Sequence, residues 1–191
     1  MIIQVRNKTA DYNTYRAARV KSLFNAERGD TFSLDANLPV EDLDWQIGLV
    51  VGASGSGKTS IGKKLFDGGK IVDLYGGWDN TKPIVEAIAP DGDFNAVTGA
   101  LASVGLGDVP SWLRPFHALS NGQQFRAGLA RLICDAPNGV VVDEFTSVID
   151  RQIAKIGAMA FAKGWRRNNG KKIVLLACHY DIIEWLQPDW V

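Results

Sequence analysis

Val50-Val51-Gly52-Ala53-Ser54-Gly55-Ser56-Gly57-Lys58-Thr59 matches the pattern G-x-x-x-x-G-K-[ST], which is typical of a loop that wraps phosphate groups. Its glycines let successive backbone N–H groups point inward, Lys58 can reach the β- and γ-phosphates, and the Thr59 hydroxyl can coordinate Mg²⁺. These residue types therefore indicate a site for a nucleoside triphosphate with Mg²⁺. The residues predicted to bind phosphate are Gly52, Ala53, Ser54, Gly55, Ser56, Gly57, Lys58, Thr59 and Ser60.

The sequence on either side of this loop supplies the strand and the helix that the motif needs. Residues 47–51 form an apolar run suited to a buried parallel strand, and residues 60–66 continue with helical spacing. The pattern by itself would also fit a glycine-rich surface turn. The strand–loop–helix context favours the phosphate loop.

The overall composition bounds the class of protein. The 191 residues suffice for one buried domain, and 21 Lys and Arg residues balance 21 Asp and Glu residues, so net charge gives no reason to expect nucleic acid or a membrane surface as a partner. No apolar run approaches the roughly 20 residues of a membrane-spanning helix, and the N-terminus lacks a secretory signal pattern. Cys134 and Cys178 each stand in an apolar run, which predicts buried thiols rather than metal ligands. We expect a cytoplasmic protein.

The rest of the chain alternates strands with helices. Runs of apolar residues predict further strands at 70–75, 140–142 and 172–178, with another at the chain end. Helical spacing predicts helices at 83–89, 94–104, 120–133 and 149–167. Residues 106–119 contain one glycine and two prolines and predict a loop with at most one helical turn. Residues 1–46 predict an antiparallel layer with a short helix near residues 12–21.

This order of elements predicts an α/β fold of the P-loop NTPase type, with a mostly parallel sheet between helices and an N-terminal antiparallel β layer before it. The short helices predict a small helical lobe at about residues 78–134, inserted into a core of residues 47–191. We expect a single domain over residues 1–191. Because the chain ends on Trp190 and Val191 without a polar tail, we also expect it to be a piece of a longer protein.

Two carboxylates follow the β-branched run of residues 140–142. Asp143 and Glu144 come directly after that strand, where ligands bind in open α/β sheets. In that place Asp143 could hold Mg²⁺ through its water shell, and Glu144 could accept a proton from an attacking water. The pair could instead form a surface salt-bridge site. The nearby phosphate loop favours the ligand-binding interpretation.

A second motif indicates a particular class of nucleotide hydrolase. Leu119-Ser120-Asn121-Gly122-Gln123 matches the L-S-x-G-Q signature of the ATP-binding-cassette (ABC) ATPases. The match continues through Gln124, Arg126, Ala130 and Arg131. In the family's order follow the carboxylates Asp143 and Glu144, a D-loop-like Ser147-Val148-Ile149-Asp150 and a switch histidine, His179. The sequence therefore resembles an ABC ATPase domain over about residues 20–185.

The resemblance implies a role for each of these residues. Glu144 and His179 would be catalytic, with His179 contacting the γ-phosphate and helping to position the attacking water, while Thr59 and Asp143 would hold Mg²⁺. The family stacks adenine on an aromatic residue before the phosphate loop. Phe24 is nearest to that register, ahead of Phe32, and either residue could instead belong to the core.

The signature also implies a partner. Ser120 and the N–H groups that follow it begin a helix, which is a favourable place for an anion. The resemblance implies that Ser120, Gly122 and Gln123 bind the nucleotide held by the other subunit. The implied assembly is an ATP-dependent head-to-tail homodimer with two ATP molecules at its interface.

Two features depart from the family's pattern. Family members carry a glutamine in a loop after the second strand, whereas residues 75–80 contain none, so that Trp78, Asp79 or Asn80 would have to substitute for it. The stretch between the phosphate loop and the signature is also short, which trims the lobe that docks on membrane subunits. Both departures weaken the interpretation as a transporter subunit.

Three functions stay open on these grounds: a soluble ATPase module that drives an attached or partner domain, the ATP-binding subunit of a membrane transporter, and a nucleotide-gated module that engages DNA. The two departures favour the first. The segments His179-Tyr180-Asp181 and Gln187-Pro188-Asp189-Trp190 are similar to those of phage and mobile-element ABC ATPases that are fused to an acetyltransferase-like domain.

Overall fold

The computed structural model describes residues 1–8, 10–25, 31–38, 40–41, 43–68, 70–167 and 170–191. These residues form two compact units, Met1–Leu43 and Asp44–Val191, and each has a sheet of its own. The second unit contains residues 47–191, which the sequence predicts as the core of the fold. The two units are described one after the other.

The first unit is a pair of antiparallel strands that carries a helix. β1 (Ile2–Lys8) pairs with β2 (Thr31–Asn37) in a continuous register. α1 (Tyr15–Phe24) begins after Thr14, whose hydroxyl accepts a hydrogen bond from the backbone N–H of Ala17. The predicted antiparallel layer and its helix are confirmed. The helix begins later than predicted because Thr14 supplies the cap.

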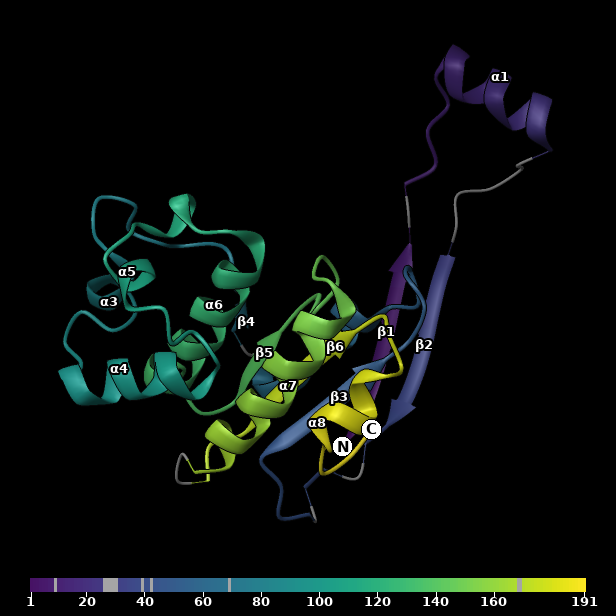
Figure 1. The fold of residues 1–191 in the computed structure, drawn as a ribbon. Coiled ribbons are helices and arrows are strands. Elements are labelled where there is room, and N and C mark those ends of the chain that lie inside the picture. The colour runs from purple at the N-terminus through teal and green to yellow at the C-terminus, as the bar shows by residue number, and fades with distance from the viewer. Residues whose placement is uncertain (9, 26–30, 39, 42, 69, 168–169) are drawn as a thin grey trace. The chain divides into compact units, whose positions relative to one another are not determined.

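The second unit is built on a parallel sheet, whose four strands are labelled β3 to β6 in Figure 1. The order across the sheet is β3 (Ile47–Val51), β6 (Ile173–Ala177), β5 (Val140–Val142) and β4 (Ile71–Val72), and every neighbouring pair is parallel. The carboxyl ends of the four strands therefore lie along one edge. β4 is shorter than the predicted strand at 70–75 because the Asp73 carboxylate accepts the N–H of Tyr75 and turns the chain.

Alternate strand residues face two different helical layers. On one face, side chains such as Leu49, Val142 and Leu175 join the main core with residues of α6 (Asn121–Asp135) and α7 (Arg151–Arg166). On the other face lies α2 (Lys58–Gly62), where a Cβ on Gly62 would come within 2.9 Å of Leu176 and 3.0 Å of Val141. Helices on both faces of a parallel sheet were predicted, and this fold class is confirmed.

A group of short helices lies beside the β4 side of the sheet in Figure 1. It consists of α3 (Ile84–Ala87), α4 (Phe94–Ser103), α5 (Val109–Trp112) and the 3-10 turn η2 (Phe116–Ala118). The prediction of at most one helical turn in residues 106–119 is wrong, because Pro110 fits the first turn of α5 and Pro115 precedes η2. The remaining elements are η1 (Leu65–Asp67) and α8 (Ile182–Leu186). None of the described helices is long and apolar enough to cross a membrane.

The last residues of the chain add a short parallel segment outside β3. The N–H of Leu49 donates to the carbonyl of Trp190 at 3.0 Å, and the N–H of Asp189 donates to the carbonyl of Ile47 at 2.8 Å. The indole of Trp190 lies against Gly48, where a Cβ would come within 2.1 Å of the ring. The predicted terminal strand is present as a single bridge between Gly48 and Trp190.

Asp189 anchors this terminal segment. Its carboxylate accepts the backbone N–H groups of Gln46 and Ile47, each at 2.8 Å, and lies 3.2 Å from the guanidinium of Arg166. Burial alone would raise the pKa of Asp189, but the two backbone donors and Arg166 together bring it below its ordinary value. The ionised carboxylate therefore stabilises the fold.

Asp189→Asn tests this anchor, because the amide keeps the shape of the side chain and removes its charge. We expect the free energy of unfolding to fall by about 1–2 kcal/mol at pH 7. The pKa is lower in the folded chain than in the unfolded chain, so the loss is full above about pH 4 and disappears as the pH falls through the folded pKa. Urea unfolding at pH 7 and at pH 3 measures both values.

The matched control is Asp35→Asn, which breaks only the exposed pair with Arg6 and is expected to leave stability unchanged at both pH values. An equal loss for Asp189→Asn at pH 7 and pH 3 would contradict the anchor.

Candidate nucleotide site

The phosphate loop leaves β3 and closes on its own lysine. Gly55 and Gly57 have φ values of 78° and 91°, in the left-handed region that glycine adopts at little cost. The Lys58 Nζ donates to the carbonyls of Gly52 and Ala53, both at 2.8 Å. The loop thus has the curled backbone that the motif predicts.

A hydrogen bond joins this loop to the end of β5. The Thr59 hydroxyl donates to an Asp143 carboxylate oxygen at 2.7 Å, and the other oxygen of that carboxylate accepts the N–H of Glu144 at 2.8 Å. Two oxygen ligands suit Mg²⁺, which is held in such sites by one or two protein groups together with phosphate oxygens and water. Thr59 and Asp143 would hold such a metal together with phosphate oxygens. Among the described residues no group of three His, Cys, Asp or Glu could hold a metal ion.

The ends of β5 and β6 bring the two predicted catalytic residues to the same edge. The N–H of Phe145 donates to the carbonyl of Leu176 at 2.8 Å, and the N–H of Gly52 donates to the carbonyl of Ala177 at 3.2 Å. Glu144 is exposed and follows β5, while His179 is half-buried and follows β6. Their roles stay predictions. His179 follows β6, which pairs directly with the strand of the phosphate loop, and Glu144 follows β5, which is the next strand along the sheet.

The signature forms a capped helix start. Ser120 is exposed and caps α6, with its hydroxyl accepting the N–H of Gln123 at 3.4 Å. The Gln123 side chain accepts the N–H of Ser120 at 3.0 Å and donates to the Ser111 hydroxyl at 2.7 Å. A Cβ on Gly122 would come within 3.0 Å of Ile153, so this glycine lets α6 approach α7. Gln123 therefore holds the helix start, and its predicted contact with a nucleotide stays a prediction.

The candidates for the missing glutamine all have partners within the second unit. The Trp78 indole N–H donates to the carbonyl of Leu74 at 3.0 Å. Asp79 accepts both the N–H and the hydroxyl of Thr81. Asn80 accepts the N–H of His117 at 3.3 Å. These contacts give all three side chains a structural role in the loop after β4.

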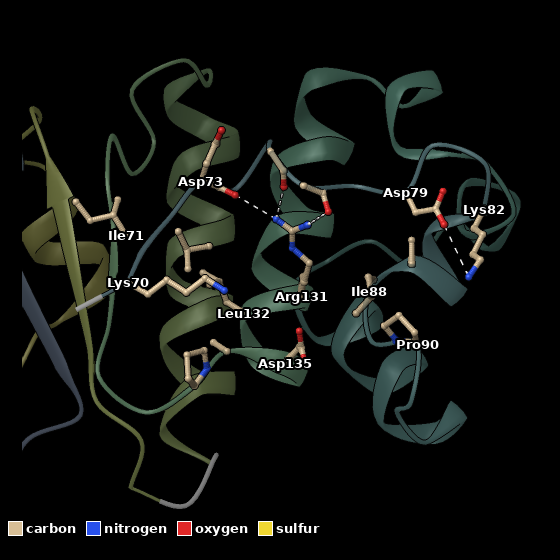
Figure 2. Close-up of a pocket in the computed structure, with 16 residues that line it drawn as sticks. Lys70, Ile71, Asp73, Asp79, Lys82, Ile88, Pro90, Arg131, Leu132 and Asp135 are labelled. Carbon is tan, nitrogen blue, oxygen red and sulfur yellow. Dashed lines mark hydrogen bonds and ion pairs between the residues drawn. The ribbon is translucent and has the colours of Figure 1, made fainter. Parts of the chain in front are cut away.

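Arg131 fastens this loop from α6. Figure 2 shows its guanidinium donating toward the loop, with bonds to the carbonyls of Asp73 at 3.1 Å, Gly76 at 2.8 Å and Gly77 at 3.4 Å. Burial lowers the pKa of Arg131, although Asp73 and Asp135 act in the opposite direction. Arg131 was noted in the sequence only as part of the signature match, and the loop that it holds could not be found from spacing.

Trp78 packs between Arg131 and Phe116. The guanidinium carbon lies 4.2 Å from the Trp78 ring centroid, and the rings of Trp78 and Phe116 stack at 4.2 Å with 8° between their planes. Trp78 is only 9% exposed. The stack joins α6, the loop after β4 and η2, three segments that are distant in sequence.

A cavity of about 540 Å³ lies next to this stack (Figure 2). It is lined by β4, the loop that follows it, α3 and the end of α6, with Lys70, Lys82, Asp79 and Asp135 among its charged residues. Its described lining includes no residue of the phosphate loop. The cavity is therefore separate from the predicted nucleotide site.

The structure brings together some of the predicted site residues and leaves others apart. The phosphate loop, Asp143, Glu144 and His179 follow three neighbouring strands. Phe24 ends α1 in the first unit, and Phe32 lies in β2 of the same unit, so adenine stacking on either stays a prediction. Cys134 and Cys178 are half-buried and unpaired.

Comparison with known sequences found one partial relative, whereas no family model matches. A segment of 66 residues is 36% identical to the methionine import ATP-binding protein MetN 2 of Acinetobacter baylyi. It covers 35% of this chain and 19% of that protein, so the chain matches about a fifth of the relative's length.

Two solved structures have the same fold. The dimeric structure of MJ0796, a bacterial ABC transporter cassette, matches with a TM-score of 0.59 and 16% identity, over 97% of this chain and 91% of that chain. The structure of a bacterial Atm1-family ABC exporter with ATP bound matches with a TM-score of 0.56 and 17% identity, over 82% of this chain and 32% of that chain. At these identities the likeness shows the fold alone.

Trp78→Ala tests the stack of Arg131, Trp78 and Phe116. Removing a buried indole that packs on two partners should lower the free energy of unfolding by about 3 kcal/mol or more. Phe94→Ala is the matched control, because Phe94 belongs to the same helical group and is 69% exposed, and a change within about 0.5 kcal/mol is expected. Urea unfolding of both variants measures the difference, and equal losses would show that the stack contributes nothing specific.

Proposed function

We propose that this chain, which has the fold of the ATP-binding cassettes, is an ATP phosphohydrolase that binds ATP with Mg²⁺ and works as a head-to-tail homodimer. The observation that carries the proposal is the 2.7 Å hydrogen bond between Thr59 and Asp143. It joins the phosphate loop to a strand-end carboxylate, as a site for a metal-bound triphosphate requires. Two relatives named as ATP-binding or ATP-bound proteins support it.

Each residue has a distinct task in this proposal. Lys58, which bonds to its own loop carbonyls, turns to the β- and γ-phosphates when ATP binds. Bound Mg²⁺ supplies positive charge to the phosphate oxygens, and Thr59 and Asp143 hold it. Glu144 accepts the proton of the attacking water, and His179 contacts the γ-phosphate and orients that water.

The exposed start of α6 supports the proposed dimer. Ser120 and Gly122 lie at the N-terminal turn of a 15-residue helix, where backbone N–H groups and the helix dipole favour an anion. We propose that this turn, with Gln123 as its support, binds the γ-phosphate held by the other subunit. A solved cassette structure with this fold is dimeric, which supports the assembly of two chains.

The process that hydrolysis drives is inferred from the loop after β4. The loop after β4 uses Trp78, Asp79 and Asn80 internally, which favours a soluble cytoplasmic module that drives an attached or partner domain. The similarity of residues 179–181 and 187–190 to phage and mobile-element ABC ATPases suggests that this domain is acetyltransferase-like. The second candidate is the ATP-binding subunit of a membrane transporter, since the relatives carry transporter names. A nucleotide-gated module on DNA is the third. Co-purification with a membrane protein, or DNA binding that depends on ATP, distinguishes them.

Lys58→Ala tests the nucleotide site. We expect ATP binding measured by calorimetry in the presence of Mg²⁺ to fall at least about a hundredfold, because the phosphate charge loses its main partner. The matched control is Lys63→Ala, since Lys63 is exposed just after α2 and outside the loop. A folded Lys58→Ala protein that keeps the affinity of the unaltered chain would place the nucleotide elsewhere.

Mixing two inactive variants tests the dimer. If each site combines Lys58 of one chain with Ser120 of the other, Lys58→Ala and Ser120→Arg should each be inactive alone. The mixed dimer has one site that has lost both groups and one site that is whole. ATP hydrolysis should therefore partly return when one variant is titrated into the other at fixed total protein.

Glu144→Gln placed in both variants serves as the blank, since the amide cannot accept the proton. The Glu144→Gln protein should also run as a dimer with ATP and as a monomer without it. A dimer that ignores ATP, together with no activity on mixing, would leave the signature without the proposed role.

A further inference from the structure

The turn that follows β5 is held in a backbone conformation that its residues do not prefer. Glu144 has a φ of 50° and Thr146 a φ of 66°, and neither is glycine. A β-branched residue such as threonine is an outlier there, and such a strained conformation persists only where the surrounding structure holds it. Since Glu144 is the proposed base, the groups that hold this turn also set where its carboxylate lies.

Arg151, the first residue of α7, reaches back to this turn. Its Nη1 donates to both the carbonyl and the hydroxyl of Thr146, each at 3.4 Å. Thr146 is 1% exposed, so its polar atoms have little water to bond with instead. These hydrogen bonds are long, but they give the buried carbonyl and hydroxyl oxygens of Thr146 a donor.

The same guanidinium reaches a second segment. Its Nε donates to one carboxylate oxygen of Asp181 at 3.1 Å and its Nη2 to the other, a two-pronged contact that fixes the orientation of both groups. The guanidinium carbon also lies 4.9 Å from the ring centroid of Trp185 in α8. Asp181 stands two residues after His179 and precedes α8.

We infer that Arg151 is a positioning residue that holds the turn of Glu144 and the segment of His179 in one fixed relation. Ser147 also joins the turn after β5 to the segment after β6, because its hydroxyl lies 3.6 Å from the sulfur of Cys178. Among the described residues Arg151 bonds to Thr146 and Asp181 and lies over the ring of Trp185, and these contacts do not include the phosphate loop. Its loss should therefore lower kcat and leave the affinity for ATP unchanged. This inference rests on the proposed hydrolysis of ATP.

Arg151→Lys and Asp181→Asn are the variants that test the link. Lysine keeps the positive charge but cannot reach Thr146 and both oxygens of Asp181 together, because it lacks the planar fork. We expect each variant to lower kcat about tenfold, since a small misplacement of catalytic groups is costly. The KM and the Kd for Mg-ATP should stay within twofold. The double variant should be no slower than the slower single variant, because both break one link.

Arg166→Lys is the matched control. Arg166 also lies on α7, pairs with an aspartate, Asp189, and donates to the carbonyls of Leu186 and Gln187 at the end of α8. This variant should lose stability without a change in kcat. Thermal unfolding of all variants is measured beside hydrolysis, so that a poorly folded protein is recognised, and the Kd is measured by calorimetry.

The outcomes separate the two proposals. An unaltered protein that binds ATP and does not hydrolyse it would overturn the proposed function itself. Hydrolysis in the unaltered protein together with an unchanged kcat in Arg151→Lys would overturn the inference alone. An equal fall of kcat in Arg166→Lys would also overturn the inference, because Arg151 would then act only through general stability. Single effects that multiply in the double variant would overturn it as well, because Arg151 and Asp181 would then act independently.

Discussion

Parallel pairing of β3, β6 and β5 makes the candidate site, because it sets three distant parts of the chain side by side at one edge. The phosphate loop leaves β3, the two carboxylates leave β5, and His179 follows β6. Thr59 can meet Asp143 only while these strands keep their register. A shift by one residue would turn the core side chains of each strand to the opposite helical layer, so the hydrophobic pattern that stabilises the fold also aligns the chemistry.

The features that could be predicted from the sequence are those that depend on a short continuous stretch of residues. The apolar run of residues 47–51, the glycines of the phosphate loop, and the carboxylates after residues 140–142 each indicated a strand end with a ligand. The contacts around Trp78 could not be predicted in this way. Arg131 and Phe116 reach it from distant positions, and only the packed helical group brings them there. The extent of β4 likewise depended on one side chain, Asp73, which bonds to the backbone.

The irregular segments of the second unit share one means of support. Arginines on the two long helices donate to backbone carbonyls of neighbouring loops and helix ends: Arg126 to Gly105, Arg131 to Asp73, Gly76 and Gly77, Arg151 to Thr146, and Arg166 to Leu186 and Gln187. The guanidinium offers several donors in a rigid plane, which suits carbonyls that point in different directions. The irregular segments of the second unit are thus hydrogen-bonded to arginines of α6 and α7.

A hydrogen bond from an arginine to a backbone carbonyl affects which residues can change over evolutionary time. Every amino acid carries the same carbonyl, so the loop held by Arg131 can exchange most of its side chains and stay attached. The arginine has no such freedom, since no other side chain has its fork of donors. Surfaces built on these loops can therefore diverge toward new partners while the helices that carry the arginines, and the strand ends behind them, are kept.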